Sequence, residues 1–192
     1  MGLTVDNVLP ANSIPGEVHQ HLKQIHVTEH DVLYRFEHIN QDWIAMQDWT
    51  YTVEFSLTSK PSDQFVLHLD NVGTHASFKL NGKDVGQTDN LFRNYFFDLD
   101  NLYVDGRPNR LEIKIDSTVR KTFEIRAMYD KMPGQDPFWN YLWLKENWIA
   151  MSRTQQTDFG WDWGPAIVPM GLFGSVHVMQ KVPFVTEKPL VI

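Results

Sequence analysis

The sequence predicts an all-β fold, built as an antiparallel two-sheet β-sandwich or jelly roll with one short helix near the N-terminus. Apolar and polar residues alternate with a period of two in several separate segments, which is typical of strands with one buried face. Turn-forming residues separate these segments, and only one stretch has helical spacing. The alternating segments are 50–57, 65–69, 76–80, 111–115 and 176–178.

The one predicted helix covers residues 17–25. Val18, Leu22 and Ile25 recur there at helical spacing and give the helix an apolar side. It follows a turn cluster that contains Pro15 and Gly16.

The clearest turn signal is Asn81-Gly82, which directly follows the segment 76–80. This dipeptide best fits a type I′ hairpin turn, because both positions need a positive φ. We therefore expect a hairpin, with Val85 on its returning strand.

A long aromatic-rich insertion, residues 128–148, interrupts the alternating pattern. It contains breakers and no steady period, and loops of that length are usually functional or disordered. Its aromatic content argues against disorder. The rings either contribute to function or attach the loop to a neighbouring surface. Residues 1–180 are the predicted sandwich domain, and 181–192 read as a linker because of Pro183 and Pro189.

Composition excludes several classes of function. The 192 residues carry a net charge of −7 with scattered Lys and Arg, which argues against nucleic acid or an anionic membrane as partner. Without cysteine, no disulfide, thiol nucleophile or cysteine-ligated zinc is possible. No apolar run reaches the roughly 18 residues of a membrane-spanning helix. The N-terminus lacks signal-peptide features, so we expect a cytoplasmic protein, or a secreted or lysosomal one if a signal has been removed.

The segment His26-Val-Thr-Glu-His30 matches a zinc-peptidase pattern, H-x-x-E-H. That pattern needs a helix, where both histidines share a face, whereas the β-branched residues Val27 and Thr28 favour a loop. We therefore predict a surface loop here and no metal site. No phosphate-binding or cofactor motif is present, and no cofactor is expected.

The segment 158–165 has the composition of a sugar-binding loop. Asp162 lies between Trp161 and Trp163, and Gly160 and Gly164 flank them. A carboxylate accepts hydrogen bonds from adjacent hydroxyls, and indole faces pack against the C–H side of a pyranose. The alternative is a tight hairpin whose tryptophans are buried against a core.

Asp158 and Asp162 are the obvious pair of carboxylates for glycoside hydrolysis. Such a pair lies about 5 Å apart in retaining enzymes and about 6.5 to 9.5 Å apart in inverting ones. Four residues of extended strand would separate them by about 13 Å. We therefore expect Asp162 to hold a substrate rather than to attack it.

The segment 153–165, RTQQTDFGWDWGP, closely resembles the signature of β-mannosidases of glycoside hydrolase family 2. Four further segments resemble that family in the right order, so the resemblance covers nearly the whole chain. They are 14–22, 48–51, 70–82 and 89–93. Their motifs are less specific and are shared with related β-galactosidases and β-glucuronidases.

The resemblance implies a galactose-binding-like jelly roll at the N-terminus of a retaining exo-β-mannosidase, followed by immunoglobulin-like domains and a catalytic (β/α)8 barrel. A barrel needs about 250 residues, so both catalytic glutamates would lie outside this chain, which should be inactive alone. The resemblance also implies that Asp162 contacts the terminal mannose of a β-mannoside oligosaccharide in the −1 subsite, and that Trp161 and Trp163 shape that pocket. Arg153 would brace the loop with Asp158, Gly160 and Gly164, although Thr154 replaces a basic residue that is usual in the family.

Two other functions remain open at this point. A free-standing carbohydrate-binding module would use the same Trp and Asp residues on an open surface. A structural domain would dock or dimerise through the aromatic insertion.

Overall fold

The computed structural model describes residues 14–57, 64–128 and 151–181. Its helices are α1 (Val18–Gln24), α2 (Glu37–Asn40) and α3 (Thr118–Ala127), with the 3-10 helices η1 (Asp42–Ile44) and η4 (Gln156–Phe159). Its strands are β1 (Gly16–Glu17), β2 (Trp49–Ser56), β3 (Phe65–Leu69), β4 (Val72–Gly73), β5 (Ala76–Leu80), β6 (Lys83–Thr88), β7 (Tyr95–Asp98), β8 (Pro108–Ile115), β9 (Gly171–Leu172) and β10 (Val176–Gln180).

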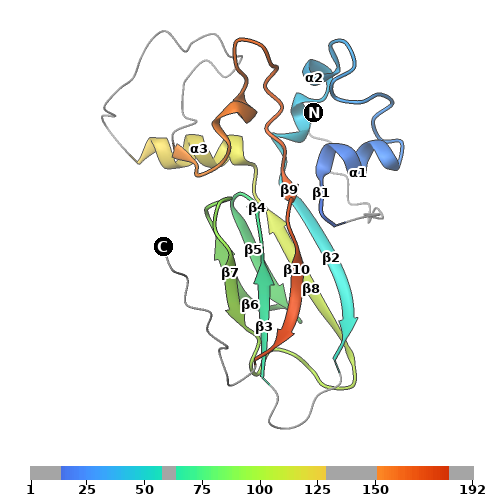
Figure 1. Cartoon of the computed structure of the whole chain (residues 1–192), viewed down its shortest axis with the longest axis vertical. Coiled ribbons are helices and arrows are strands. Elements are labelled where there is room, and N and C mark those ends of the chain that lie inside the picture. Colours follow the sequence, from blue (N-terminus) through green and yellow to red (C-terminus); the bar gives the residue numbers. More distant parts are fainter. Residues whose placement is uncertain (1–13, 58–63, 129–150, 182–192) are drawn as a thin grey trace, which may run out of the picture.

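Two antiparallel sheets form the body of the molecule (Figure 1). One has the order β2-β8-β5-β6 and the other the order β10-β3-β7, while a small sheet, β1-β9-β4, lies at one end. The helices and the 151–170 segment gather at that same end (Figure 1). The antiparallel β-sandwich expected from the sequence is confirmed, and its jelly-roll winding stays a prediction.

The core lies between the two large sheets, where the alternating residues of neighbouring strands meet. Leu67 of β3, Phe78 of β5 and Ile113 of β8 are buried in one cluster, and Phe78 and Ile113 are directly paired across β5 and β8. The outward residues of these strands are less buried. The period of two therefore identified the core face correctly. In β2 the same face is only half-buried, and Val53 is exposed.

The predicted hairpin is confirmed. Asn81 and Gly82 have φ angles of 53° and 77°, and Leu80 pairs with Lys83 across the turn. Both central residues thus have the positive φ that a type I′ turn needs.

The predicted helix at 17–25 is confirmed as α1. The Glu17 carboxylate caps it by accepting from the backbone amides of His19 and Gln20. Val18 and Leu22 are buried in the main core.

The expectation of a single helix is wrong, because α2 and the ten-residue α3 are also present. Ser117 caps α3 by accepting from the Arg120 amide, and its hydroxyl donates to the Ala45 carbonyl oxygen at 2.6 Å. Asp48 accepts from the Ser117 amide and pairs with the Arg120 guanidinium. These contacts attach α3 to the segment before β2.

A second, smaller core lies at the helical end of the sandwich. It comprises Ala45, Val119 of α3, Phe159 of η4 and Val168, with Met46 packed against it. Phe159 is only 1% exposed. This cluster joins three distant parts of the sequence, and it holds the 151–170 segment in place.

Three other segments carried expectations from the sequence: the loop at residues 26–30, the aromatic insertion and the linker. Residues 26–30 form turns and bends, so the predicted loop is confirmed. The aromatic insertion lies outside the described residues except for Met128, as does the proposed linker except for Lys181. Within the described part of the chain, no helix is both long and apolar enough to cross a membrane.

Candidate functional site

The Trp-Asp-Trp sequence forms a closed turn, with Asp162 and Trp163 at its tip. The Trp161 amide donates to the Gly164 carbonyl oxygen at 3.0 Å, and the Gly164 amide donates back to the Trp161 carbonyl oxygen at 3.2 Å. These two reciprocal bonds fix the backbone around the Asp162 carboxylate.

The two tryptophans lie on either side of this carboxylate in the sequence, and their rings touch. Their ring centroids are 5.9 Å apart at an interplanar angle of 68°, an edge-to-face contact. Trp161 is half-buried, whereas Trp163 is 81% exposed and Asp162 is exposed. The alternative of a hairpin with buried tryptophans is therefore wrong for Trp163. The Trp163 indole and the Asp162 carboxylate are therefore both exposed at the surface.

Gly160 links the turn to η4 with a φ of +97°, a conformation that favours glycine. At Gly164 there is room for a side chain, because a Cβ added there would meet nothing within 4 Å. Within η4, the Asp158 carbonyl oxygen accepts from the amides of both Ile167 and Val168 at 3.0 Å. These bonds tie the two ends of the loop together below the turn.

The Asp158 side chain lies in a different environment from that of Asp162. It is partly buried, and burial raises the pKa of its carboxyl to about 6. The assumption of an extended strand between Asp158 and Asp162 is wrong, because η4 and the turn replace it, so the span of about 13 Å does not apply. Asp158 and Asp162 still differ in their exposure. Asp158 is partly buried, whereas Asp162 is exposed at the tip of the turn.

Arg153 contacts the loop between β6 and β7 through its backbone. Its carbonyl oxygen accepts from the Leu91 amide at 2.9 Å, and it forms an isolated parallel bridge with Asn90. The 151–155 segment is thereby attached to the loop between β6 and β7. The Arg153 side chain is exposed.

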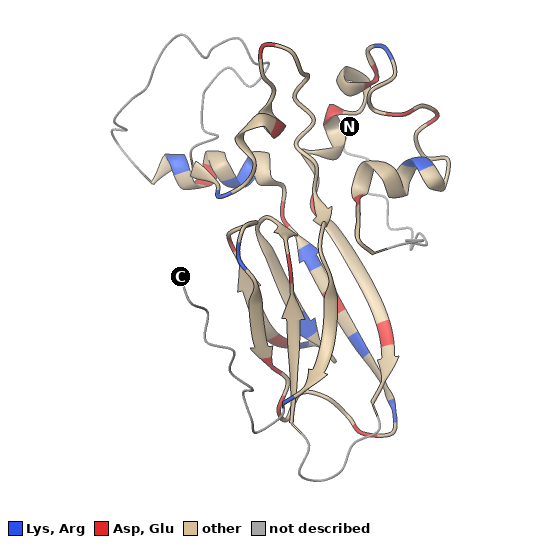
Figure 2. Cartoon of the chain, viewed as in Figure 1, with Lys and Arg blue, Asp and Glu red and all other residues tan. Residues whose placement is uncertain are grey.

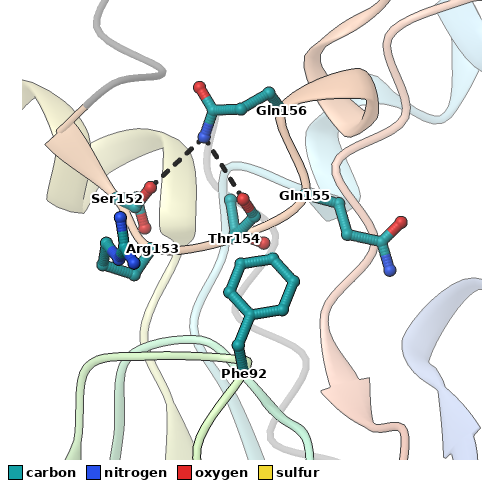
Figure 3. Close-up of a pocket in the computed structure, with 6 residues that line it drawn as sticks. All are labelled: Phe92, Ser152, Arg153, Thr154, Gln155 and Gln156. Atoms are coloured by element: carbon teal, nitrogen blue, oxygen red, sulfur yellow. Dashed lines mark hydrogen bonds between the residues drawn. The ribbon is translucent and has the colours of Figure 1, made fainter.

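An open pocket of about 400 Å³ lies where these two loops meet (Figure 3). It is lined by Phe92, Ser152, Arg153, Thr154, Gln155 and Gln156. None of the residues of the Trp161–Gly164 turn lines it. Of the lining residues, the sequence pointed to Arg153 as a brace and to Thr154 as a departure from the family motif. Phe92 lay in a matching segment, 89–93, without an assigned role.

Charge around the described part of the chain is mixed. Lys and Arg are spread among Asp and Glu along the strands and helices in the view of Figure 2. The described residues contain no group of three or more His, Cys, Asp or Glu that could hold a metal ion.

Comparisons with known proteins agree with this architecture. The chain is similar to β-mannosidase of Rattus norvegicus, with 33% identity over 88% of this chain and 19% of the relative. It is also similar to β-mannosidase A of Emericella nidulans, with 31% identity over 92% of this chain and 18% of the relative. The chain thus spans about a fifth of the length of the curated relatives it matches.

A crystal structure of β-D-mannosidase from Dictyoglomus thermophilum has the same fold over most of the chain. Its TM-score is 0.73 at 27% identity, with 86% of this chain and 20% of that chain covered. The family described as glycosyl hydrolase 2 galactose-binding domain-like matches residues 3–174. The chain therefore belongs to the galactose-binding-like domain family of glycosyl hydrolase family 2.

Proposed function

We propose that this chain is the non-catalytic N-terminal domain of a retaining exo-β-mannosidase, and that its Trp161–Gly164 turn completes the −1 subsite for terminal β-linked mannose. One observation carries the proposal: a backbone-locked turn presents the Asp162 carboxylate and the exposed Trp163 ring together. The catalytic glutamates would belong to a (β/α)8 barrel of the same polypeptide, outside this chain.

The turn would contribute binding that increases in the transition state. A carboxylate can accept hydrogen bonds from two adjacent hydroxyls of the terminal sugar. Hydrogen bonds to hydroxyls of that sugar strengthen as the ring becomes oxocarbenium-like. Because the reciprocal bonds of the turn already fix the backbone that carries the Asp162 carboxylate, little backbone reorganisation is needed when the substrate binds.

The end of the sandwich that carries the turn also has exposed apolar residues, which the barrel would cover. Leu33, Phe36 and Ile39 are exposed apolar residues in and before α2. In Figure 1, α2 lies at the same end of the sandwich as the 151–170 segment. Contiguous exposed apolar surface marks an interaction site, and these three residues lie within seven positions of the sequence. We therefore assign this end of the molecule to the contact with the barrel.

The decisive variant is Asp162→Ala in the complete polypeptide. The loss of transition-state binding should be about 2 to 4 kcal/mol, a fall in kcat/KM of roughly 30- to 1,000-fold, with the melting temperature unchanged. Asp84→Ala is the matched control, because Asp84 is an exposed carboxylate on β6 that pairs only loosely with Lys79. Intact activity in Asp162→Ala would mean that Asp162 has no role in the pocket.

A free-standing carbohydrate-binding module is the rival function, since an exposed Trp163 beside Asp162 also suits an open binding surface. Calorimetry on the 192-residue chain separates the two. Our proposal expects little or no binding of oligomannoside, because the turn supplies only part of a pocket. Clear binding by the isolated chain would favour the module.

A further inference from the structure

The outer faces of the two large sheets differ in charge. In the sheet β10-β3-β7, β3 and β10 contain no Lys, Arg, Asp or Glu. In the other sheet, β8 carries Arg110, Glu112 and Lys114 on its outer face, and Figure 2 shows charged residues along this strand. An outer face that stays in water normally carries polar residues. The face of β10-β3-β7 is therefore composed like a covered one.

A row of three rings crosses this face. His68 of β3 is paired with His177 of β10 on one side and with Phe96 of β7 on the other. The rings of His68 and Phe96 stack with their centroids 4.5 Å apart and their planes at 10°, and the centroids of His68 and His177 are 6.4 Å apart. Because stacked rings are not coplanar, the row forms no flat platform on which a sugar could lie.

A second row beside the rings is aliphatic. Met179 of β10 is paired there with Val66 of β3. Phe96 is 58% exposed and Met179 is 37% exposed, and no described helix lies over this sheet (Figure 1). Aromatic residues and Met are typical of the core of a protein interface, and charged residues are depleted there. The outer apolar face, as we name it, consists of Val66, His68, Phe96, His177 and Met179.

The chain leaves this face at a fixed point. Lys181 directly follows β10, and its ammonium group pairs with the carboxylates of Asp98 at 2.7 Å and Asp100 at 3.0 Å. Its backbone amide donates to the Gln64 carbonyl oxygen at 2.7 Å. Since Asp98 belongs to β7, at the opposite edge of the sheet, these contacts hold the point from which residues 182–192 continue beside the outer apolar face.

The size of the face favours an occupant in the same polypeptide. Three strands about 4.8 Å apart, with five residues at about 3.3 Å per residue, give an area on the order of 200 Å². A stable complex between separate proteins buries about 800 Å² on each partner. A second copy of the chain would therefore gain too little from this face alone. A domain tethered beside it is held there at a high effective concentration.

We propose that the outer apolar face is the docking surface for the domain that directly follows Ile192 in the complete polypeptide, and that this domain presents apolar side chains to it. The inference rests on the proposed function, which places further domains in the same polypeptide. The chain spans about a fifth of the length of its curated relatives, which leaves room for such a domain. This contact is separate from the barrel contact at the helical end of the sandwich.

Oxidation of the complete polypeptide by hydroxyl radicals, read by mass spectrometry, tests the docking. The reference for each residue is its oxidation rate in a proteolytic digest, where it is fully exposed. Because oxidation follows exposure, an open face would give about half the reference rate for Phe96, 58% exposed, and about a third for Met179, 37% exposed. A docked domain should reduce both rates to about a tenth of the reference or less.

Phe96→Lys places a charge in the middle of the face and should undock the domain, so that the oxidation rate of Met179 rises about 3-fold. Thr52→Lys is the matched control, because Thr52 is exposed on the edge strand β2, opposite Glu112 on the outer face of the other sheet. Met179 should stay protected in that variant. Phe78, 1% exposed in the core, should stay unoxidised in every variant if the sandwich is folded.

Wild-type rates of about half and a third of the reference would overturn the docking, as would a Met179 that stays protected in Phe96→Lys. Protection that is lost on about 100-fold dilution would also overturn it, because a second copy would then cover the face. The activity of Asp162→Ala tests the proposed function separately. If that variant loses activity while the face is open, only the docking is wrong. If it keeps full activity while the face is protected, only the role of the turn is wrong.

Discussion

Replacing Asp158 by asparagine should make the folded chain more stable at neutral pH. The carboxyl of Asp158 is partly buried, and burial raises its pKa to about 6, against 3.8 for an unburied aspartate. Within the described residues, no cation or side-chain donor pairs with it. Folding at neutral pH therefore moves a carboxylate into a less hydrated position without compensation.

The magnitude follows from the two pKa values. A difference of about 2 in pKa corresponds to about 3 kcal/mol. Partial exposure reduces this figure by solvent screening, so we expect Asp158→Asn to stabilise the chain by about 1 to 2 kcal/mol at pH 7.5. Because the folded pKa is raised, the cost of burial is absent below pH 3.8, grows as the pH rises towards 6, and is constant above that.

Urea denaturation at pH 4.5 and pH 7.5 measures this effect. The gain in free energy of unfolding should be larger at pH 7.5 than at pH 4.5. Asp84→Asn, which changes a side chain that is 89% exposed, should show no such difference. An Asp158→Asn variant that is no more stable than the parent at pH 7.5 would refute the reasoning, because the carboxylate would then have a favourable partner that offsets its burial.

Two further predictions concern the attachment of the site loop. Phe159→Ala should lower the free energy of unfolding by about 3 to 5 kcal/mol, because it empties the centre of the smaller core; a loss below about 1 kcal/mol in thermal denaturation would contradict that packing. Asp48→Asn should cost about 1 kcal/mol at pH 7. Burial opposes ionisation of Asp48, but hydrogen bonds from Ser117, Arg120 and Lys114 outweigh it and lower its pKa, so the loss should disappear as the pH falls below about 3.8.

Local sequence was enough to predict the sandwich. In β3, β5 and β8, apolar residues occupy every second position because one face of each strand is buried against the other sheet. The Asn81-Gly82 turn was predictable for a similar reason, since few dipeptides accept two positive φ angles.

The α3 helix was missed because its buried face is not apolar. Thr118 and Thr122 are buried beside Val119, so the sequence carries no apolar stripe at helical spacing. Ser117 was the available signal, as a residue type that favours helix N-caps. The extended form assumed for 158–162 failed because Gly160 and the reciprocal bonds of the turn reverse the chain there.

The position of the candidate site depends on contacts that no sequence window contains. Phe159 packs on Val119 and Ala45, which lie 40 or more residues away, and Arg153 is attached to Leu91. The Trp161–Gly164 turn itself is closed by bonds between residues three apart. Nearby residues therefore determine its shape, whereas distant residues determine its position. A motif search therefore finds the turn and its carboxylate. Only the folded sandwich shows that the 151–155 segment, which leads into the turn, is attached to the β6–β7 loop through Arg153.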